Sequence, residues 1–159
     1  MQAKAIKGRS LEEIQSALQQ CLSDGFKPTV AIVFISIKLD RLAVCGLLHQ
    51  QGIVILGATS SGEFINGYQD QDSAVMLLMS LRPGSFTVLF EDIAASNLDD
   101  AATRLARTAL QSFKKPAFIL CSTGVSTNAE YLDGEKLVHS IANIVGPEVN
   151  IYGGMAGED

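Results

Sequence analysis

The chain has 159 residues, of which 47% are hydrophobic and 18% charged, and its formal net charge at pH 7 is −5. This length and composition are typical of one folded domain and argue against disorder. The sequence has no apolar run long enough to span a bilayer, no recognisable secretory signal and no basic stripe, so we expect neither a membrane nor a nucleic acid as partner. We expect Cys21, Cys45 and Cys121 to be buried free thiols of a cytoplasmic protein, and we find no internal repeat.

The first half of the chain alternates between helical patterns and short apolar runs. Ser10 with Glu13 is a capping box, and Asp40 can likewise begin a helix. The apolar runs are short and rich in β-branched residues, which is typical of strands buried on both faces. In chain order we expect a helix from Ser10 to Gly25, a strand over 29–36, a helix from Asp40 to about Gln51 and a strand over 53–56.

The second half of the chain continues with a hairpin and two helix–strand pairs. Pro83 and Gly84 form a turn signal between two strand-like runs, which predicts an antiparallel hairpin. Asn97, followed by two aspartates, is a typical helix start. In chain order we expect strands over 73–81 and 86–91, a helix from Asn97 to about Lys114, a strand over 117–121, a helix from about Gly134 to Val145 and a strand over 149–152.

Buried strands that alternate with amphipathic helices predict an α/β fold. We expect a mixed, mostly parallel sheet flanked by helices, with the antiparallel hairpin inserted, and a single domain over residues 1–159. Right-handed crossovers would bring several carboxyl ends of strands to one edge of this sheet.

Three polar, glycine-containing loops each follow a predicted strand, at 57–64, 122–128 and 153–159. Ligands of α/β sheets bind beyond the carboxyl ends of the strands, where small residues let backbone amides approach a ligand and hydroxyls add donors and acceptors. The same residue types also serve simply to turn the chain. The pattern therefore leaves open a ligand site and a set of ordinary turns, and it matches neither a phosphate loop nor a dinucleotide fingerprint.

The titratable residues allow several interpretations. Glu63 either accepts hydrogen bonds from a cationic group of a ligand or caps amides of its own loop. His49 and His139 fit a boundary position on their helices better than the role of a metal ligand or base. Because no nucleophile and base occur at a recognisable spacing, we expect no enzyme activity.

Two of the loops resemble segments of a known family. ILGATSSGEF (55–64) resembles the glycine-rich segment of FIST N domains, and IYGGMAGED (151–159) resembles their Gly-Gly-x-Ala-Gly segment with its following acid. The resemblance runs from about residue 26 to 159. It implies a sensory module of a signal-transduction protein that binds an amino acid or a related metabolite. The resemblance points to nine ligand-binding positions: Ser60, Ser61, Gly62, Glu63, Gly153, Gly154, Ala156, Gly157 and Asp159. The position of the second glycine-containing loop after a predicted strand adds Ser122, Thr123 and Gly124.

Two alternative functions remain, of which the resemblance implies the first. Some family members bind haem and respond to nitric oxide. In this chain such haem binding would need His49 or His139 as the axial ligand. Apart from this alternative we expect no cofactor and no metal. An interaction module without a small ligand is the other alternative. Because FIST N domains continue past this motif, we expect a truncated domain, whose exposed sheet edge would allow pairing into a homo-oligomer. A small-molecule ligand and a signalling protein are the expected partners.

Overall fold

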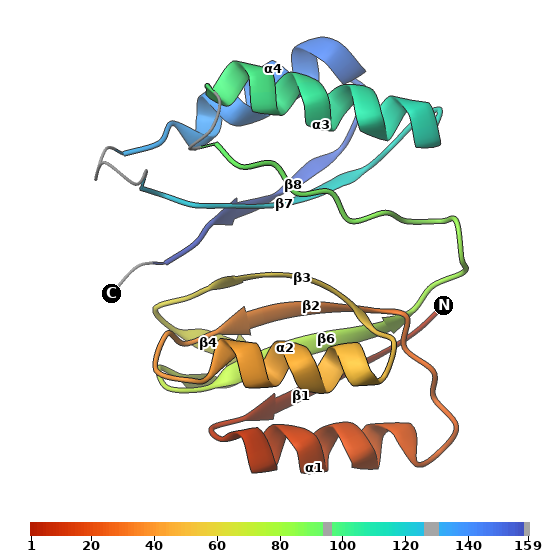
Figure 1. Ribbon diagram of the computed structural model, residues 1–159, viewed down its shortest axis with the longest axis vertical. Coiled ribbons are helices and arrows are strands. Elements are labelled where there is room, and N and C mark those ends of the chain that lie inside the picture. Colours follow the sequence, from red (N-terminus) through yellow and green to blue (C-terminus); the bar gives the residue numbers. More distant parts are fainter. Residues whose placement is uncertain (94–96, 126–130, 158–159) are drawn as a thin grey trace. The chain divides into compact units, whose positions relative to one another are not determined.

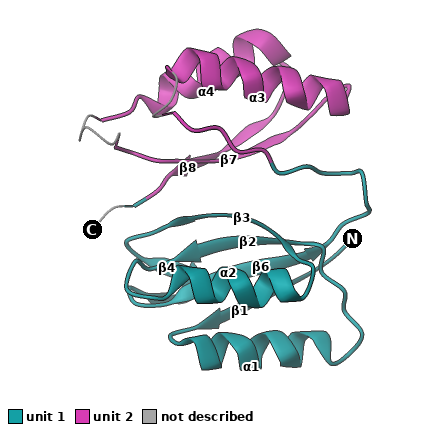
Figure 2. Cartoon of the chain, in the orientation of Figure 1, with its two compact units in different colours: residues 1–88, 157–159 teal, residues 89–156 magenta. Residues whose placement is uncertain are grey.

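The computed structural model of the chain describes residues 1–93, 97–125 and 131–157 (Figure 1). These residues form two compact units, unit 1 with residues 1–88 and 157–159 and unit 2 with residues 89–156 (Figure 2). Four helices and eight strands confirm the predicted α/β class, while the single domain stays a prediction. None of the described helices combines the length and the apolar character needed to cross a membrane.

Unit 1 consists of a four-stranded sheet, two helices and a small hairpin. Its helices are α1 (Leu11–Leu22) and α2 (Arg41–Gln50), which begin at the predicted N-caps Ser10 and Asp40. Its sheet has the order β1-β6-β2-β3, formed by β1 (Gln2–Gly8), β2 (Val30–Ile35), β3 (Val54–Thr59) and β6 (Ala74–Ser80). The hairpin is formed by β4 (Glu63–Ile65) and β5 (Tyr68–Asp70).

The sheet of unit 1 is mixed, as predicted, but it is not mostly parallel. Strands β2 and β3 run parallel, whereas β6 runs antiparallel to both β1 and β2. The chain returns from β3 to β6 through the hairpin and without a crossover helix, so β6 enters the sheet in the opposite direction. The prediction of a mostly parallel sheet is therefore wrong for this unit.

The predicted hairpin of strands 73–81 and 86–91 is also wrong. The first run forms β6, which pairs with β1, a strand that the sequence analysis missed; the second run forms no strand. The hairpin lies instead at β4–β5, where Asn66 and Gly67 have φ values of 50° and 79°. Positive φ at both positions is the geometry of the Asn-Gly turns that best match the twist of paired strands.

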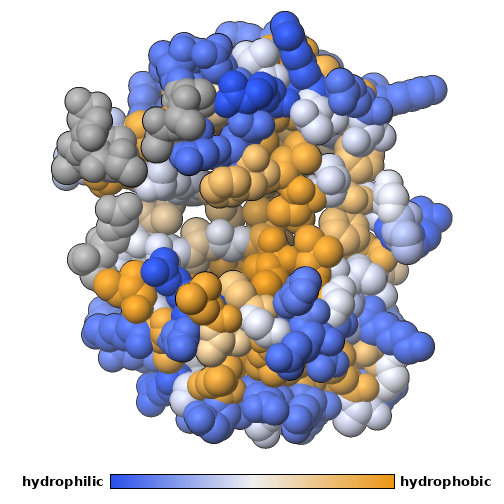
Figure 3. All heavy atoms as spheres, viewed as in Figure 1, coloured by the Kyte–Doolittle hydropathy of each residue, from blue (hydrophilic) through white to orange (hydrophobic). Residues whose placement is uncertain are grey.

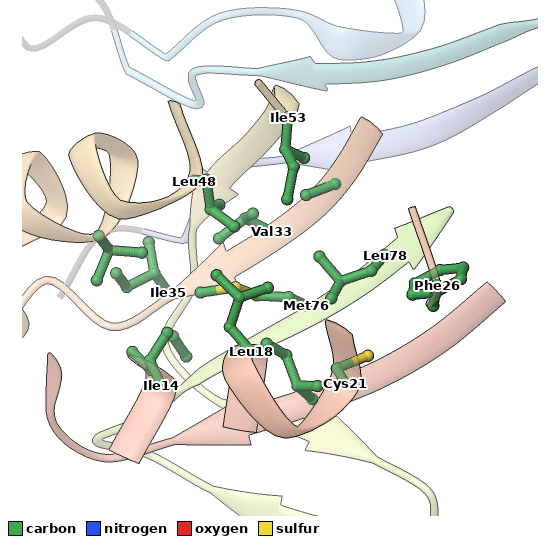
Figure 4. Packing of buried hydrophobic residues seen from close by; sticks show 14 residues of the cluster. Ile14, Leu18, Cys21, Phe26, Val33, Ile35, Leu48, Ile53, Met76 and Leu78 are labelled. Carbon is green, nitrogen blue, oxygen red and sulfur yellow. The ribbon is translucent and has the colours of Figure 1, made fainter. Parts of the chain in front are cut away.

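The core of unit 1 lies between the two helices and the sheet. Ile14 and Leu18 of α1, Leu48 of α2, and Met76 and Leu78 of β6 are each at most 2% exposed and belong to one cluster (Figure 4). Burying one such side chain fully contributes about 1.5–3 kcal/mol. This cluster therefore fixes the strands whose ends carry the candidate site.

One residue in each of the strands β2 and β6 is exposed. Phe34 on β2 is 41% exposed and Leu77 on β6 is 39% exposed, although their sequence neighbours are buried. The prediction that strand 29–36 is buried on both faces holds only in part: on the side of Phe34, Val30 is buried and Ile32 half-buried, while the opposite side packs in the cluster with α1 and α2. On the face shown in Figure 3, hydrophilic residues dominate the surface of α1 and α3, as amphipathic helices require.

Unit 2 consists of two helices and two strands. Its elements are α3 (Leu98–Ser112), β7 (Phe118–Ser122), α4 (Gly134–Val145) and β8 (Ile151–Met155). The helices begin at the N-caps Asn97 and Asp133, and the two strands pair in parallel. Alanines of α3 pack with Phe118, Leu137 and Ile141 in a second core. All four elements were predicted, with β8 placed two residues too early.

Each unit contains a β–α–β arrangement with the same glycine feature. In β2–α2–β3 a Cβ atom built on Gly57 would lie 2.2 Å from the carbonyl oxygen of Val33. In β7–α4–β8 a Cβ atom on Gly153 would lie 2.0 Å from the carbonyl oxygen of Leu120. The close approach of two parallel strands therefore requires glycine at both positions. The sequence does not reveal that the two β–α–β arrangements are alike, because their helices differ in length, with 10 and 12 residues, and share few identical positions.

Candidate functional site

Three strand ends meet at one edge of the unit 1 sheet. The carboxyl ends of β2 and β3 lie side by side, and the amino end of β6 joins β2 there. The Ser36 amide donates to the Ser73 carbonyl at 2.9 Å, and the Ser60 amide donates to the Ile35 carbonyl at 3.1 Å. Backbone bonds therefore fix the three strand ends. The predicted loop over 57–64 is too long, because its first three residues belong to β3 and Glu63 begins β4, which leaves residues 60–62 as the connecting turn.

Glu63 joins these strand ends through its side chain. Its carboxylate is buried, with 1% of the residue exposed. One oxygen, Oε1, accepts from the Ser60 hydroxyl at 2.7 Å, and Oε2 accepts from the Ser73 amide at 3.2 Å and the Ser73 hydroxyl at 3.1 Å. All three donors are neutral. Glu63 thus braces its own loop, which is one of the two roles that the sequence left open; a direct ligand contact stays a prediction.

Buried polar residues are concentrated at this edge. In the part of the chain that the structure describes, three polar or charged residues are buried, Ser36, Glu63 and Ser73, and all three lie here. Burying polar groups costs free energy unless they are hydrogen-bonded. Within the described residues, no buried side-chain nitrogen or oxygen lacks a partner. The fold therefore holds a fully satisfied polar cluster at one end of an otherwise apolar core.

The turn beside this cluster is open to solvent. Ser61 and Gly62 are exposed, while Ser60 is half-buried and links them to the Glu63 carboxylate. A Cβ atom on Gly62 would meet nothing closer than 3.6 Å, so packing does not require glycine there. Ser61 and Gly62 therefore form the exposed part of this turn, and Gly157 packs against Ser61.

A charged cluster that the sequence did not predict holds β5, the second strand of the hairpin. Arg9 pairs through Nε with Asp70 and donates from Nη2 to the Tyr68 hydroxyl at 2.8 Å, and that hydroxyl donates to Asp70 at 3.0 Å. The hydrogen bond from Arg9 holds the pKa of Asp70 at about 2. Lys7 lies over the Tyr68 ring, 2.8 Å from its centroid. The Asn-Gly turn was the signal that could have revealed this hairpin.

The candidate residues that follow β7 in unit 2 bond mainly to their own loop. Ser122 is the last residue of β7, and its hydroxyl donates to the Thr123 carbonyl at 3.0 Å. The Thr123 hydroxyl donates to the Val125 carbonyl at 2.9 Å, while Gly124 is buried. The Ala156 amide donates to the Ser122 carbonyl at 2.6 Å, which brings the ends of β7 and β8 together.

Two predicted loop glycines lie inside a strand. Gly153 and Gly154 belong to β8 and pair with Leu120 and Cys121, so the prediction of a loop from residue 153 onward is wrong. The strand continues because glycine allows the close approach to β7 described above. Asp159 and residues 126–128 lie outside the described residues.

Gly157, the last described residue, belongs to unit 1. Its amide donates to the Thr59 carbonyl at 3.1 Å, and the Thr59 hydroxyl donates to the Gly157 carbonyl at 3.2 Å. These bonds place the predicted site residue Gly157 beside the turn that begins at Ser60. The other candidates of the glycine-rich carboxyl-terminal segment, Gly153, Gly154 and Ala156, belong to unit 2.

The histidines and cysteines form no cluster with the spacing of a metal site. Both His49 and His139 are exposed, and a haem role for either stays a prediction. Cys21 is buried and Cys121 half-buried, and burial raises the pKa of both thiols. Cys45 is exposed on the side of α2 that faces away from the core, so its predicted burial is wrong. Within the described ranges, no group of three or more His, Cys, Asp or Glu side chains could hold a metal ion.

Comparison with known proteins gives one match. The family model of the FIST N domain matches residues 29–159, which is most of the chain and includes both glycine-rich segments. No curated protein and no solved structure matches. FIST domains form a family of sensory domains in signal transduction. The chain belongs to the FIST N domain family.

Proposed function

We propose that this chain is a sensory module that binds a small polar ligand, an amino acid or a related metabolite, at the turn Thr59–Glu63. The observation that supports the proposal is the position of the buried polar residues, which all lie at one sheet edge among the described residues. A fold can do without a buried polar cluster of this kind, because replacing all its members together by apolar groups of similar shape is often neutral, whereas removing one member is costly. A polar cluster beside an exposed turn is typical of a site that holds its ligand-contacting residues in one geometry.

The chemistry of the turn fits a ligand that carries both an ammonium and a carboxylate group. The Glu63 carboxylate has neutral donors only, and the half-buried Ser60 lies between it and solvent. An ammonium group about 4 Å from that carboxylate would gain about 4 kcal/mol at an effective dielectric constant of 20, before desolvation. Ser61 and Gly62 are exposed residues, and hydrogen-bond donors of theirs could bind a carboxylate. Amino acids carry both groups on one carbon.

The proposal does not use the candidate residues of unit 2. The hydroxyls of Ser122 and Thr123 donate to neighbouring carbonyls, and Gly153 is required by strand packing. The position of their loop after a strand is what supports ligand roles for Ser122, Thr123 and Gly124, and the family resemblance is what supports them for Gly153, Gly154 and Asp159. A contribution from any of them would appear as a loss of ligand response after substitution.

Thermal shift with the twenty protein amino acids and their simple derivatives tests the proposal. A ligand present at 100 times its dissociation constant should stabilise the protein by about 2.7 kcal/mol. Ser60→Ala should weaken the response, because it removes the hydroxyl between the carboxylate and the ligand. Ser16→Ala is the matched control, since Ser16 is an exposed serine of α1 far along the chain from the turn.

The outcomes separate a binding role from a purely structural one. A shift that is lost in Ser60→Ala and retained in Ser16→Ala supports the proposed site. No shift with any compound of the panel would contradict it. A shift that both variants retain would place the ligand elsewhere and would also reject the turn as the site.

A further inference from the structure

Two cationic residues follow strands of unit 1 that end beside the buried polar cluster. Arg9 comes directly after β1, and Lys38 comes three residues after the end of β2. Both strands end opposite Ala74, the first residue of β6. In the sheet order β1-β6-β2-β3, β2 is the neighbour of β3, whereas β6 and β2 separate β1 from β3. Lys38 therefore belongs to the strand end next to the turn at 60–62.

Hydrogen bonds hold the segment that carries Lys38 at this edge. The buried Ser36, directly after β2, donates from its amide to the Ser73 carbonyl at 2.9 Å. The Leu39 amide donates to the Ser36 carbonyl at 3.1 Å, and the Lys38 amide donates to the Ser36 hydroxyl at 3.4 Å. The backbone of Lys38 is thus fixed to a member of the polar cluster, while its side chain extends into solvent.

The Lys38 ammonium pairs with a carboxylate that water also reaches. Its Nζ donates to Oδ1 of Asp72 at 2.8 Å, and the two side chains are 64% and 56% exposed. Asp72 directly precedes Ser73, whose amide and hydroxyl donate to Glu63. An ion pair this exposed contributes little to stability, because water and salt compete for both charges. Another carboxylate can therefore take the place of Asp72 at little cost.

Arg9 is bound in a different way. Its guanidinium pairs with Asp70 and donates to the Tyr68 hydroxyl at 2.8 Å, and that hydroxyl donates to Asp70 at 3.0 Å. The Asp70 side chain is only 13% exposed. A ligand carboxylate could reach Arg9 only by breaking this network, so Lys38 is the cation at this edge that is suited to an exchange of partners.

We propose that Lys38 binds the carboxylate of the ligand by exchanging Asp72 for it. The inference rests on the proposed function, because it assigns a charged contact to the ligand at the turn. Lys38 supplies the positive charge that the neutral donors of Ser61 and Gly62 lack. Glu63 attracts the ammonium group, so the two charged groups of a free amino acid meet opposite charges. The ligand class narrows to compounds with a free carboxylate, since amides, esters and simple amines lack the group that Lys38 binds.

NMR titrations at low ionic strength test this role. Each of the twenty protein amino acids is compared with its α-carboxamide, and the amide signals of Ser60, Ser61 and Gly62 report binding. For wild type we expect the bound amino acid to have an affinity about tenfold higher than its carboxamide, as loss of a charge-assisted hydrogen bond implies. Lys38→Gln should lose this preference. Asp72→Asn should bind the amino acid up to about fivefold more tightly, because the competing carboxylate is gone.

A second ion pair of unit 1 provides matched controls. Lys4 on β1 pairs with Asp24, which follows α1. Lys4→Gln and Asp24→Asn change the net charge as the two test variants do, and both should keep the wild-type affinity and preference. In the double variant Lys38→Gln/Asp72→Asn the gain from Asp72→Asn should disappear, because it acts through Lys38.

The results separate this role from the proposed function. A preference for the free carboxylate that is lost in Lys38→Gln and kept in Lys4→Gln supports the proposal. Equal binding of amino acid and carboxamide by wild type, or a preference that Lys38→Gln retains, would reject Lys38 and leave the site at the turn standing. An affinity that Asp72→Asn does not raise would reject the exchange of partners. Absence of any binding to wild type would reject the proposed function and this role together.

Discussion

Replacing Glu63 with alanine should destabilise unit 1 strongly. The substitution leaves the buried Ser73 amide without its acceptor, which costs about 1–3 kcal/mol. It also removes the acceptor of the Ser60 and Ser73 hydroxyls and opens a cavity, while the relief of a buried charge offsets part of the loss. We expect a net loss of about 2–4 kcal/mol, equivalent to a fall in Tm of roughly 10 °C for a chain of this length.

Glu63→Gln should cost much less, about 1 kcal/mol. The amide oxygen can keep both bonds from Ser73, and the Ser60 hydroxyl can rotate to accept from the new NH2 group. The remaining loss is the charge assistance to these bonds. Urea and thermal unfolding followed by circular dichroism measure the difference, since the chain has no tryptophan for fluorescence.

Two results would refute this reasoning. If alanine were as stable as wild type, the hydrogen bonds to Glu63 would not stabilise the fold, and the carboxylate would be present for another purpose. If glutamine were as harmful as alanine, the negative charge rather than the hydrogen-bond geometry would brace the turn.

Three further variants and probes test other parts of the structure. Gly153→Ala should destabilise unit 2 by about 2 kcal/mol or more in urea unfolding. The new Cβ atom would overlap a carbonyl of β7, and the φ of residue 153 is 148°. Gly154→Ala is the control and should be nearly neutral. The pKa of Asp70 is about 2 in the folded chain and 3.8 ordinarily. The stabilisation from its carboxylate is therefore complete only above about pH 5 and is lost as the pH falls through 3.8 toward 2. Over this range Tm should fall more steeply for wild type than for Asp70→Asn. A thiol reagent should modify the exposed Cys45 fast and the buried Cys21 slowly, and equal rates would contradict the burial of Cys21.

The local signals in the sequence predicted the helices well. Ser10, Asp40 and Asn97 are N-caps as expected, because each side chain accepts from an amide only three residues further along the chain. Such bonds depend on short sequence segments and hardly on the rest of the fold. The strands over 29–36 and 53–56 were likewise identified from their own composition.

The strand pairing could not be predicted in the same way. The run 86–91 has a strand-like composition but forms no strand, while β1, with lysines at Lys4 and Lys7, pairs with β6 from 66 or more residues away. Pairing is decided by tertiary contacts that composition does not reveal. The same holds for Glu63, because its partner Ser73 lies ten residues further along the chain, directly before β6, and no local pattern links the two residues.

Two-dimensional 1H–15N NMR spectra of the chain with an equimolar mixture of the twenty protein amino acids would test the proposed site most directly. We expect the amide signals of Ser60, Ser61 and Gly62 to shift, with a smaller change at Gly157, which is bonded to Thr59 within unit 1. Unchanged signals at the turn, with or without changes elsewhere in the described chain, would contradict a ligand site at the edge of the unit 1 sheet.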